Sequence, residues 1–355
     1  MQLTILLAAS IITAQPLANA EVLEPSIRNE VDHALSVAAT NEVAVSDASV
    51  AFAALYATNG MSATARAISL VSSQKGGRWQ YEGRDVTPVA RRLLRRAAGI
   101  EEPPLKLAIF SDHVEDIARQ KGIPFSEAAA KVKALGIDGI ALSEGFPAAR
   151  IAEAEKAGLV VSCVIGWPKF DGDRYDEAHC AELIAKARAH GCRQVMLVPG
   201  FWPNGARRDE VRRAIVERTN RFAAEAAKAG LETMVEDFDN DNAPTFGRAR
   251  TEEFFKAAPT VGFVYDTGNF IGSGERAENG LAFLGRLRHF HLKDRPSPNG
   301  GRSVAIGSGV MPIEKIIAAA RDAGYEGWFT IEHFGVPNML ESVEASVKFL
   351  RGIRP

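Results

Sequence analysis

The sequence predicts an α/β fold, in which a (β/α)8 barrel over residues 105–355 follows a small all-helical extension over residues 21–100. From Leu105 onward, short β-branched or apolar runs alternate with amphipathic helical stretches. Eight such units fit into the 251 residues from 105 to 355. A barrel of this kind typically needs roughly 250 residues.

The predicted strands share an apolar run that ends in polar residues. They span Lys106–Ser111, Asp138–Ser143, Leu159–Ile165, Gln194–Pro199, Glu232–Glu236, Gly262–Tyr265, His289–Leu292 and Trp328–Glu332. The predicted helices between them include Ser126–Leu135, Ala148–Ala157, Asp176–His190, Arg208–Ala229, Ile313–Ala323 and Leu340–Leu350. Four of these helices are followed by a glycine that can end them, at Gly136, Gly158, Gly191 and Gly230. A doubly wound open sheet is the alternative, but no glycine-rich phosphate turn follows the first strand.

The extension before the barrel is alanine-rich. It predicts helices over residues 27–39, 46–56, 62–73 and 88–98, with a boundary at Glu101–Pro104, where two prolines stop a helix. Nothing in these residues indicates a function.

The first twenty residues have the pattern of a signal peptide. An apolar run from Leu3 to Ala14 precedes small residues at Ala18 and Ala20, and the run is too short to span a bilayer. The segment before the run lacks Lys and Arg, which is atypical, and a buried N-terminal helix is the alternative. We expect a periplasmic or secreted protein whose mature chain begins at Glu21; without cleavage it would be cytoplasmic.

Composition and charge narrow the function classes. The 355 residues are 46% hydrophobic and 24% charged, with a net charge of -2, which gives no global reason to expect nucleic acid or an anionic membrane as partner. The three cysteines lack metal-ligand spacing, and no stretch after the leader is long and apolar enough to span a membrane.

Four consecutive predicted strands each end in a carboxylate or an imidazole. These residues are Glu236, Asp266, His291 and Glu332. Strand ends are often polar, and a single acid or histidine there is unremarkable. However, active sites of such barrels lie at the C-terminal strand ends, and neighbouring strands are ~4.8 Å apart. We therefore expect the four side chains to bind one divalent ion: Mn²⁺ in first place, otherwise Mg²⁺, Co²⁺ or Zn²⁺.

These strand ends resemble the xylose isomerase-like TIM-barrel superfamily, also called the apurinic endonuclease family 2 fold. The similar segments are VEDFD (235–239), VYDTGNF (264–270), HFHLKDR (289–295), IGSGVMPIEKI (306–316) and FTIEHFG (329–335). The resemblance runs from Leu105 to about Leu350. It implies that the four residues are metal ligands and that Glu236 and Glu332 also act as acid and base. One departure is Asn269, where many members have histidine.

The metal set and the resemblance together predict an isomerase or epimerase of a sugar or keto-sugar. One glutamate would remove a proton next to a carbonyl, the metal would stabilise the enediolate, and the other glutamate would return the proton. The alternative is a lyase or dehydratase acting on a keto-sugar, inosose or 3-keto-glycoside. An endonuclease IV-like hydrolase and a non-catalytic sugar-binding barrel are weaker alternatives. The expected partner is a small carbohydrate, without nucleic acid, and a homo-oligomer is left open.

Several further residues are candidates for substrate contact. They are Glu144, His113, Asn269, Trp167, Trp202, Lys293 and Arg295, with Phe170 and Phe201 as further loop aromatics. Aromatic side chains there could form a wall for sugar stacking, and local packing explains them equally well. Lys293 and Arg295 could bind an anionic group or form plain ion pairs.

Overall fold

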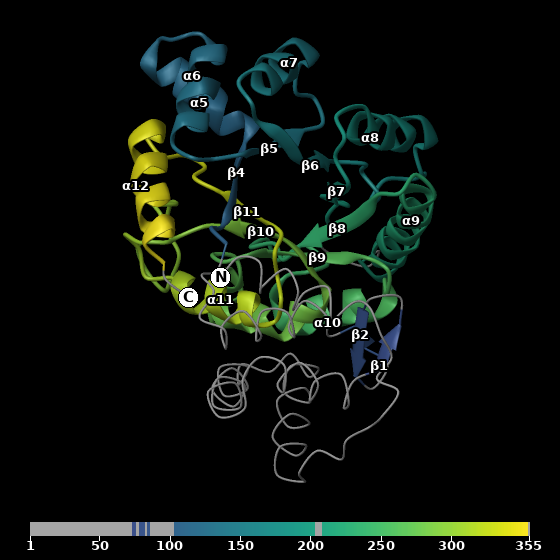
Figure 1. Ribbon diagram of the computed structural model, residues 1–355. Helices are drawn as coiled ribbons and strands as arrows, with labels where there is room; N and C mark the ends of the chain where they lie inside the picture. Colours follow the sequence, from purple (N-terminus) through teal and green to yellow (C-terminus); the bar gives the residue numbers. More distant parts are fainter. Residues whose placement is uncertain (1–72, 76–77, 82–83, 86–102, 203–207, 354–355) are drawn as a thin grey trace, which may run out of the picture. The chain divides into compact units, whose positions relative to one another are not determined.

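The computed structural model describes residues 73–75, 78–81, 84–85, 103–202 and 208–353 (Figure 1). The predicted leader and the N-terminal helices at 27–39, 46–56 and 88–98 lie outside these residues. So does the helix predicted over 62–73, apart from Ser73, which begins a strand.

A small antiparallel sheet precedes the barrel, so the prediction of an all-helical extension is wrong for this segment. Its strands are β1 (Ser73–Lys75), β2 (Arg78–Tyr81) and β3 (Arg84–Asp85), in that order. Lys75 pairs with Arg78, and Tyr81 pairs with Arg84, so each pair is separated by two residues. Those residues are Gly76-Gly77 and Glu82-Gly83. In the sequence, a glycine-containing dipeptide between short runs with β propensity is a hairpin signal.

Residues 105–353 contain a closed parallel barrel, as predicted. Its strands are β4 (Lys106–Phe110), β5 (Gly139–Ser143), β6 (Val160–Gly166), β7 (Gln194–Leu197), β8 (Glu232–Glu236), β9 (Gly262–Asp266), β10 (Leu287–Leu292) and β11 (Trp328–Ile331). The last strand pairs with the first, with Thr330 opposite Ala108, which excludes the open-sheet alternative. Strand order follows chain order around the barrel, so consecutive strand ends are neighbours in space.

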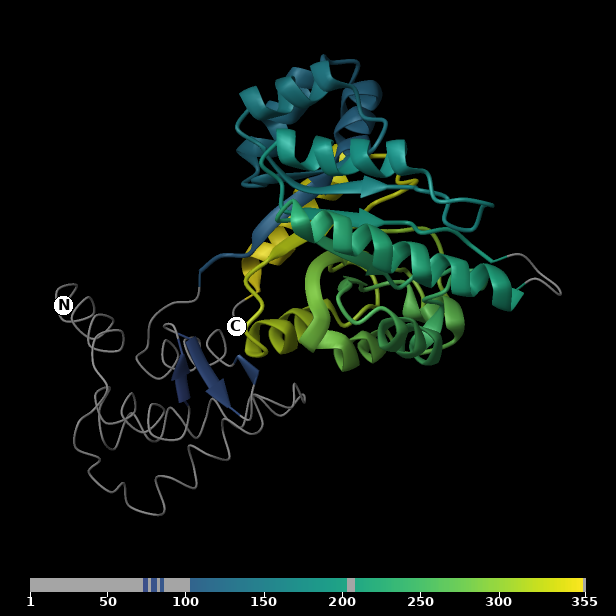
Figure 2. The same cartoon turned by 90° about the vertical axis from the view of Figure 1, so that its right-hand side faces the viewer.

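Helices lie around the outside of the strands (Figures 1 and 2). They are α5 (Ser111–Lys121), α6 (Phe125–Ala134), α7 (Ala148–Lys156), α8 (Glu177–Ala189), α9 (Arg208–Lys228), α10 (Gly247–Ala257), α11 (Ile313–Asp322) and α12 (Met339–Gly352), with 3-10 helices η1 (Phe270–Ser273) and η2 (Ala277–Arg286). The four predicted helix-ending glycines all have positive φ angles, between 64° and 88°. None of the helices in the described part of the chain has the length and apolar character needed to cross a membrane.

Helix α5 was not predicted, because its first residues, Ser111-Asp112-His113, look like a loop after a strand. The chain instead passes directly from β4 into the helix at Ser111. His113 therefore lies in the first turn of a helix, where it is fully buried.

Buried side chains from six neighbouring strands form the apolar floor beneath the C-terminal mouth. The cluster comprises Phe110, Ala141, Cys163, Ile165, Met196, Val198, Met234 and Val264. Phe201 and Phe238 pack against it and remain partly buried. The ring of Phe110 lies 4.8 Å from that of His291, centroid to centroid, so this floor reaches the predicted metal ligands.

A single buried carboxylate fixes the loop that follows β10. Asp294 Oδ1 accepts hydrogen bonds from the backbone N–H groups of Arg295 and Met311, and Oδ2 accepts from those of Gly307 and Gly309, at 2.9–3.1 Å. Gly309 must be glycine because a Cβ there would collide with this carboxylate. Residues 307–311 are thereby tied to the strand end that carries His291.

We expect Asp294→Ala to lower the free energy of unfolding by at least about 3 kcal/mol, because four backbone donors lose a charged acceptor. Denaturant unfolding measures the change. Asp138→Ala is the matched control, since Asp138 is exposed and forms a surface ion pair with Lys133. It should cost less than about 1 kcal/mol. Equal losses in the two variants would contradict the role of Asp294 in fixing the loop.

Candidate metal centre

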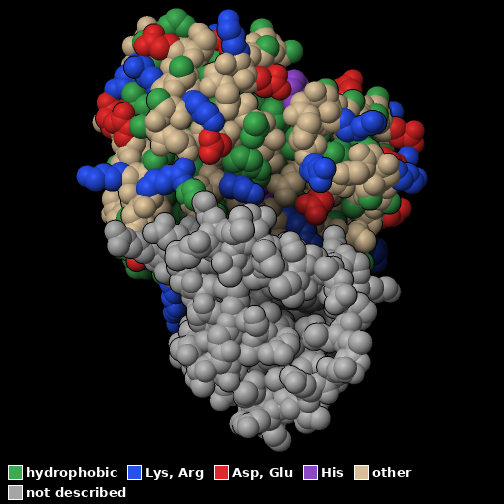
Figure 3. Space-filling model, viewed as in Figure 1, with side chains coloured by type: hydrophobic (Ala, Val, Ile, Leu, Met, Phe, Trp, Pro, Cys, Tyr) green, Lys and Arg blue, Asp and Glu red, His purple; other side chains and the backbone are tan. Residues whose placement is uncertain are grey.

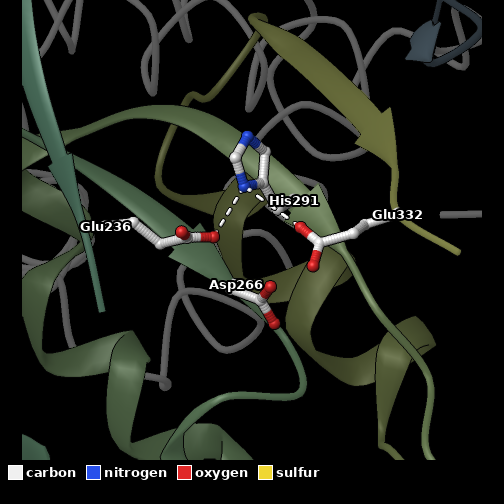
Figure 4. A group of neighbouring side chains, drawn as sticks. All are labelled: Glu236, Asp266, His291 and Glu332. Carbon is white, nitrogen blue, oxygen red and sulfur yellow. Dashed lines mark hydrogen bonds and ion pairs between the residues drawn. The ribbon is translucent and has the colours of Figure 1, made fainter. Parts of the chain in front are cut away.

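The four side chains predicted to bind a metal meet at the C-terminal mouth of the barrel. Glu236 and Asp266 are the last residues of β8 and β9, His291 lies at the end of β10, and Glu332 follows β11. Each offers one ligand atom, and these atoms lie within 4.8 Å of one another. Figure 4 shows the three carboxylates and the imidazole pointing toward a common centre.

Strand register produces this convergence. His291 pairs with Asp266 on one side and with Thr330 on the other, and the Glu332 N–H donates to the Leu292 carbonyl at 3.0 Å. Because parallel neighbours in register end at the same level, residues far apart in sequence arrive at one height in the barrel.

The cluster is buried, and this makes its negative charge costly. All four residues are at most 6% exposed. Burial, followed by the neighbouring charge of Asp266, raises the pKa of Glu236 well above its usual value. Burial also raises the pKa of Glu332 to about 8, although Lys293 opposes the rise. Glu236 and Glu332 therefore resist full ionisation until a cation joins them.

The imidazole of His291 completes a donor set that suits a divalent ion. Its Nδ1 lies 2.6 Å from Glu236 Oε1 and 3.3 Å from Glu332 Oε2 (Figure 4). Burial lowers the pKa of His291, which favours the neutral form that binds metals. Three carboxylate oxygens and one nitrogen match the preferences of Mn²⁺, Mg²⁺, Co²⁺ or Zn²⁺. The residues present therefore fit the metal that the sequence predicts.

Asp237 supports the cluster from behind, a role that sequence reasoning missed. Its Oδ1 accepts the backbone N–H of Asp266 at 2.9 Å, and burial raises its pKa well above the usual value. The Gly268 N–H donates to Asp266 Oδ1 at 2.7 Å. The sequence signal for this role was the pair of adjacent acids, Glu236 and Asp237, at a strand end. Because successive strand residues point in opposite directions, only one of the two can face the metal, and the other is free to bind the neighbouring strand.

Lys293 lies against the metal-ligand cluster. Its Nζ is 2.7 Å from Asp266 Oδ2 and 2.5 Å from Glu332 Oε1, and it donates to Asn269 Oδ1 at 2.9 Å. Burial opposes its charge, but the carboxylates of Asp266 and Glu332 raise its pKa overall. Asn269 is also held by the protein, because its Nδ2 donates to the Asp237 carbonyl at 2.7 Å.

The other charged candidates are occupied by protein partners. Arg295 donates to Asp239, to the Gly268 carbonyl and to the Gly301 carbonyl, at 2.7, 3.3 and 2.6 Å. The N–H groups of Gly307 and Gly309, which could have bound a phosphate, donate to Asp294 instead. Through its contacts with Gly268, Asp239 and Gly301, the guanidinium of Arg295 connects the loops that follow β8, β9 and β10.

Glu144 and His113 also have structural partners. Glu144 Oε2 accepts from the Trp167 N–H at 2.7 Å and lies 3.0 Å from His179 Nε2, which fixes the loop after β6. His113 Nε2 accepts the backbone N–H of His333 at 2.7 Å. The structure does not bring either side chain among the four cluster residues.

The predicted aromatic wall is only partly accessible. Trp167 is 38% exposed, whereas Phe170 and Trp202 are buried. The Trp202 ring packs under the guanidinium of Arg250 at 5.2 Å. Phe334, which sequence reasoning missed, is 45% exposed and lies edge-on to Phe110 at 5.2 Å. The sequence signal for an aromatic side chain near the cluster was the position of Phe334, two residues after Glu332.

Charges of both signs are present on the face shown in Figure 3. Lys, Arg, Asp and Glu side chains are interspersed there over the described part of the barrel. This agrees with the net charge of -2 for the whole chain.

Comparison with known proteins gives both sequence and structural relatives. An inosose dehydratase from Geobacillus thermodenitrificans is 31% identical over 111 residues, which cover 26% of this chain and 37% of the relative. The chain therefore spans well under two thirds of that relative's length.

Two solved structures share the fold. A xylose isomerase-like TIM-barrel protein from Mycobacterium smegmatis, in complex with magnesium, is 18% identical with a TM-score of 0.54, covering 70% of this chain and 96% of that one. A D-psicose 3-epimerase from Clostridium cellulolyticum H10, with D-tagatose, is 17% identical with a TM-score of 0.55, covering 70% and 99%.

The family model described as "Xylose isomerase-like TIM barrel" matches residues 129–353, which is more than half of the sequence. That range includes all four cluster residues and seven of the eight barrel strands. The chain belongs to the xylose isomerase-like TIM-barrel family.

Proposed function

We propose that this chain is a divalent-metal-dependent enzyme that moves protons next to the carbonyl of a sugar or keto-sugar. The observation that carries the proposal is the buried convergence of Glu236, Asp266, His291 and Glu332 at the barrel mouth. These four residues would hold the metal. Mn²⁺ is our first choice, and the magnesium in the Mycobacterium smegmatis relative supports a hard divalent ion.

The two glutamates would carry the proton chemistry. They come from β8 and β11, on either side of His291, so a substrate between them would meet one carboxylate on each face (Figure 4). A bound cation would supply Lewis-acid polarisation of the substrate carbonyl. One glutamate removes the proton beside that carbonyl, which gives an enediolate of the substrate, and the other delivers a proton.

The destination of the proton decides the reaction. Return to the same carbon gives epimerisation, and delivery to the adjacent carbon gives isomerisation. Proton delivery to a departing hydroxyl or glycosyl oxygen gives elimination. We propose the isomerase or epimerase reaction first. The lyase or dehydratase reaction is the second candidate, and the inosose dehydratase relative supports it.

The surroundings of the centre favour an uncharged carbohydrate. Phe110 and Phe334 provide an apolar side, and Trp167 lies exposed on the β6 loop. The cations Lys293 and Arg295 are bound to protein acceptors. An amphipathic ring with hydroxyl groups suits these surroundings better than a phosphate ester.

Two other functions are supported less well. An endonuclease IV-like hydrolase needs several metal ions, and the described residues contain one cluster of possible metal ligands. A non-catalytic binding barrel would not need two buried glutamates held close to an imidazole.

We also propose that the protein is exported, on the basis of the apolar leader and the small residues before Glu21. Its oligomeric state stays open, and a homo-oligomer is compatible with the proposal.

Proton exchange tests the reaction class directly. The metal-loaded protein is incubated in D₂O with a panel of ketoses and 3-keto-sugars, and ¹H NMR follows the carbons beside the carbonyl. We expect metal-dependent loss of one C–H signal, with or without net product. Cleavage of abasic DNA instead of exchange would support the hydrolase, and inertness in both assays would support the binding barrel.

Glutamine substitution separates proton transfer from metal binding. Glu236→Gln and Glu332→Gln keep an oxygen ligand but lose the basic carboxylate. We expect exchange to fall by ~10²-fold or more while part of the metal is retained. Asp266→Asn is the matched ligand-only control, and its loss should follow occupancy and recover in excess metal. If all three variants recover equally with added metal, the glutamates are ligands alone, and Glu144 and His113 become the bases to test.

Mass spectrometry of protein from the native cell tests export. We expect a mature chain that begins at or near Glu21. A chain that retains Met1 or Gln2 would contradict the signal-peptide interpretation.

A further inference from the structure

Lys293 contacts the metal-ligand cluster directly in the metal-free chain. Its side chain is 10% exposed, and its ammonium reaches two of the four cluster residues, Asp266 and Glu332. Its Nζ forms ion pairs with Asp266 Oδ2 at 2.7 Å and with Glu332 Oε1 at 2.5 Å, and it donates a hydrogen bond to Asn269 Oδ1 at 2.9 Å. Two carboxylates of the cluster therefore hold the ammonium in the metal-free chain.

The chain holds Lys293 in this position from several directions. Thr267 Oγ1 donates to the Lys293 carbonyl and accepts its N–H, at 2.8 and 2.9 Å. A Cβ at Gly268 would meet the Lys293 stem at 2.9 Å, so glycine leaves the space that the stem fills. Asn269 is fixed by its own bond to the Asp237 carbonyl. The segment Thr267-Gly268-Asn269 thus fixes the position of the Lys293 side chain.

The net charge of the metal centre limits the number of divalent ions that it can hold. Metal binding requires the ionised form of the carboxylate ligands; in that form, three carboxylates, one ammonium and a neutral imidazole carry two net negative charges. One divalent cation neutralises them, and a second would leave an excess of positive charge in a buried site. An incoming cation also competes with Lys293 for oxygens of Asp266 and Glu332.

We propose that Lys293 is the internal counter-cation of the metal centre, which pairs with Asp266 and Glu332 before the metal enters, limits the centre to one divalent ion and weakens its binding. The proposal rests on the metal centre proposed above. It assigns Lys293 a positioning role through the metal ligands Asp266 and Glu332.

Mn²⁺ titration of the metal-free full-length chain, followed by calorimetry, tests this role. We expect the wild type to bind one ion. Lys293→Gln keeps a hydrogen-bond donor but removes the charge, so it should bind Mn²⁺ at least about tenfold more tightly, because a like charge beside the ion is gone. Lys131→Met is the matched control, since Lys131 is exposed on α6, and it should bind as the wild type does.

If Lys293→Gln folds only in the presence of metal, the titration of metal-free protein is not possible, and a second measurement replaces it. Loaded protein is mixed with excess chelator, and the release of Mn²⁺ is followed. Lys293→Gln should release the ion at least about tenfold more slowly than the wild type. Unchanged or weaker binding together with unchanged or faster release would overturn the proposal and leave the metal centre intact. If the wild type binds no Mn²⁺, the metal centre itself is refuted.

Discussion

The mutual repulsion of three buried carboxylates is the constraint on which this structure depends. Glu236, Asp266 and Glu332 are brought together at the barrel mouth with almost no access to water. Such a group pays a large desolvation cost unless positive charge compensates it. Lys293 supplies part of the compensation in the metal-free chain, and a divalent cation would supply the rest.

The barrel makes this costly arrangement rigid. Register between β9 and β10 sets Asp266 level with His291, and Asp237 binds the Asp266 backbone from behind. Asp294 then ties the following loop to the same strand end. Asp266 and His291 are therefore positioned by backbone contacts that do not depend on the metal, which is the preorganisation that a catalytic centre requires.

The sequence was sufficient for the barrel and for the four cluster residues, because parallel strands that end in polar residues must present them at one edge. It was insufficient for the direction in which a side chain turns and for secondary structure that rests on only a few residues. Lys293 and Arg295 follow the same strand and look alike in sequence, yet one turns to the carboxylates and the other joins two loops. Helix α5 was hidden by its polar first turn, and the strands β1–β3 are too short, at two to four residues, to give a clear alternating pattern.

Anomalous diffraction from crystals grown with Mn²⁺ tests the central claim most directly, since it locates the ion without assuming an activity. The account predicts one strong peak per chain, bounded by Glu236, Asp266, His291 and Glu332, with the Lys293 ammonium no longer bridging Asp266 and Glu332. No peak at this position in crystals soaked to saturation, or a cluster of several ions, would contradict it.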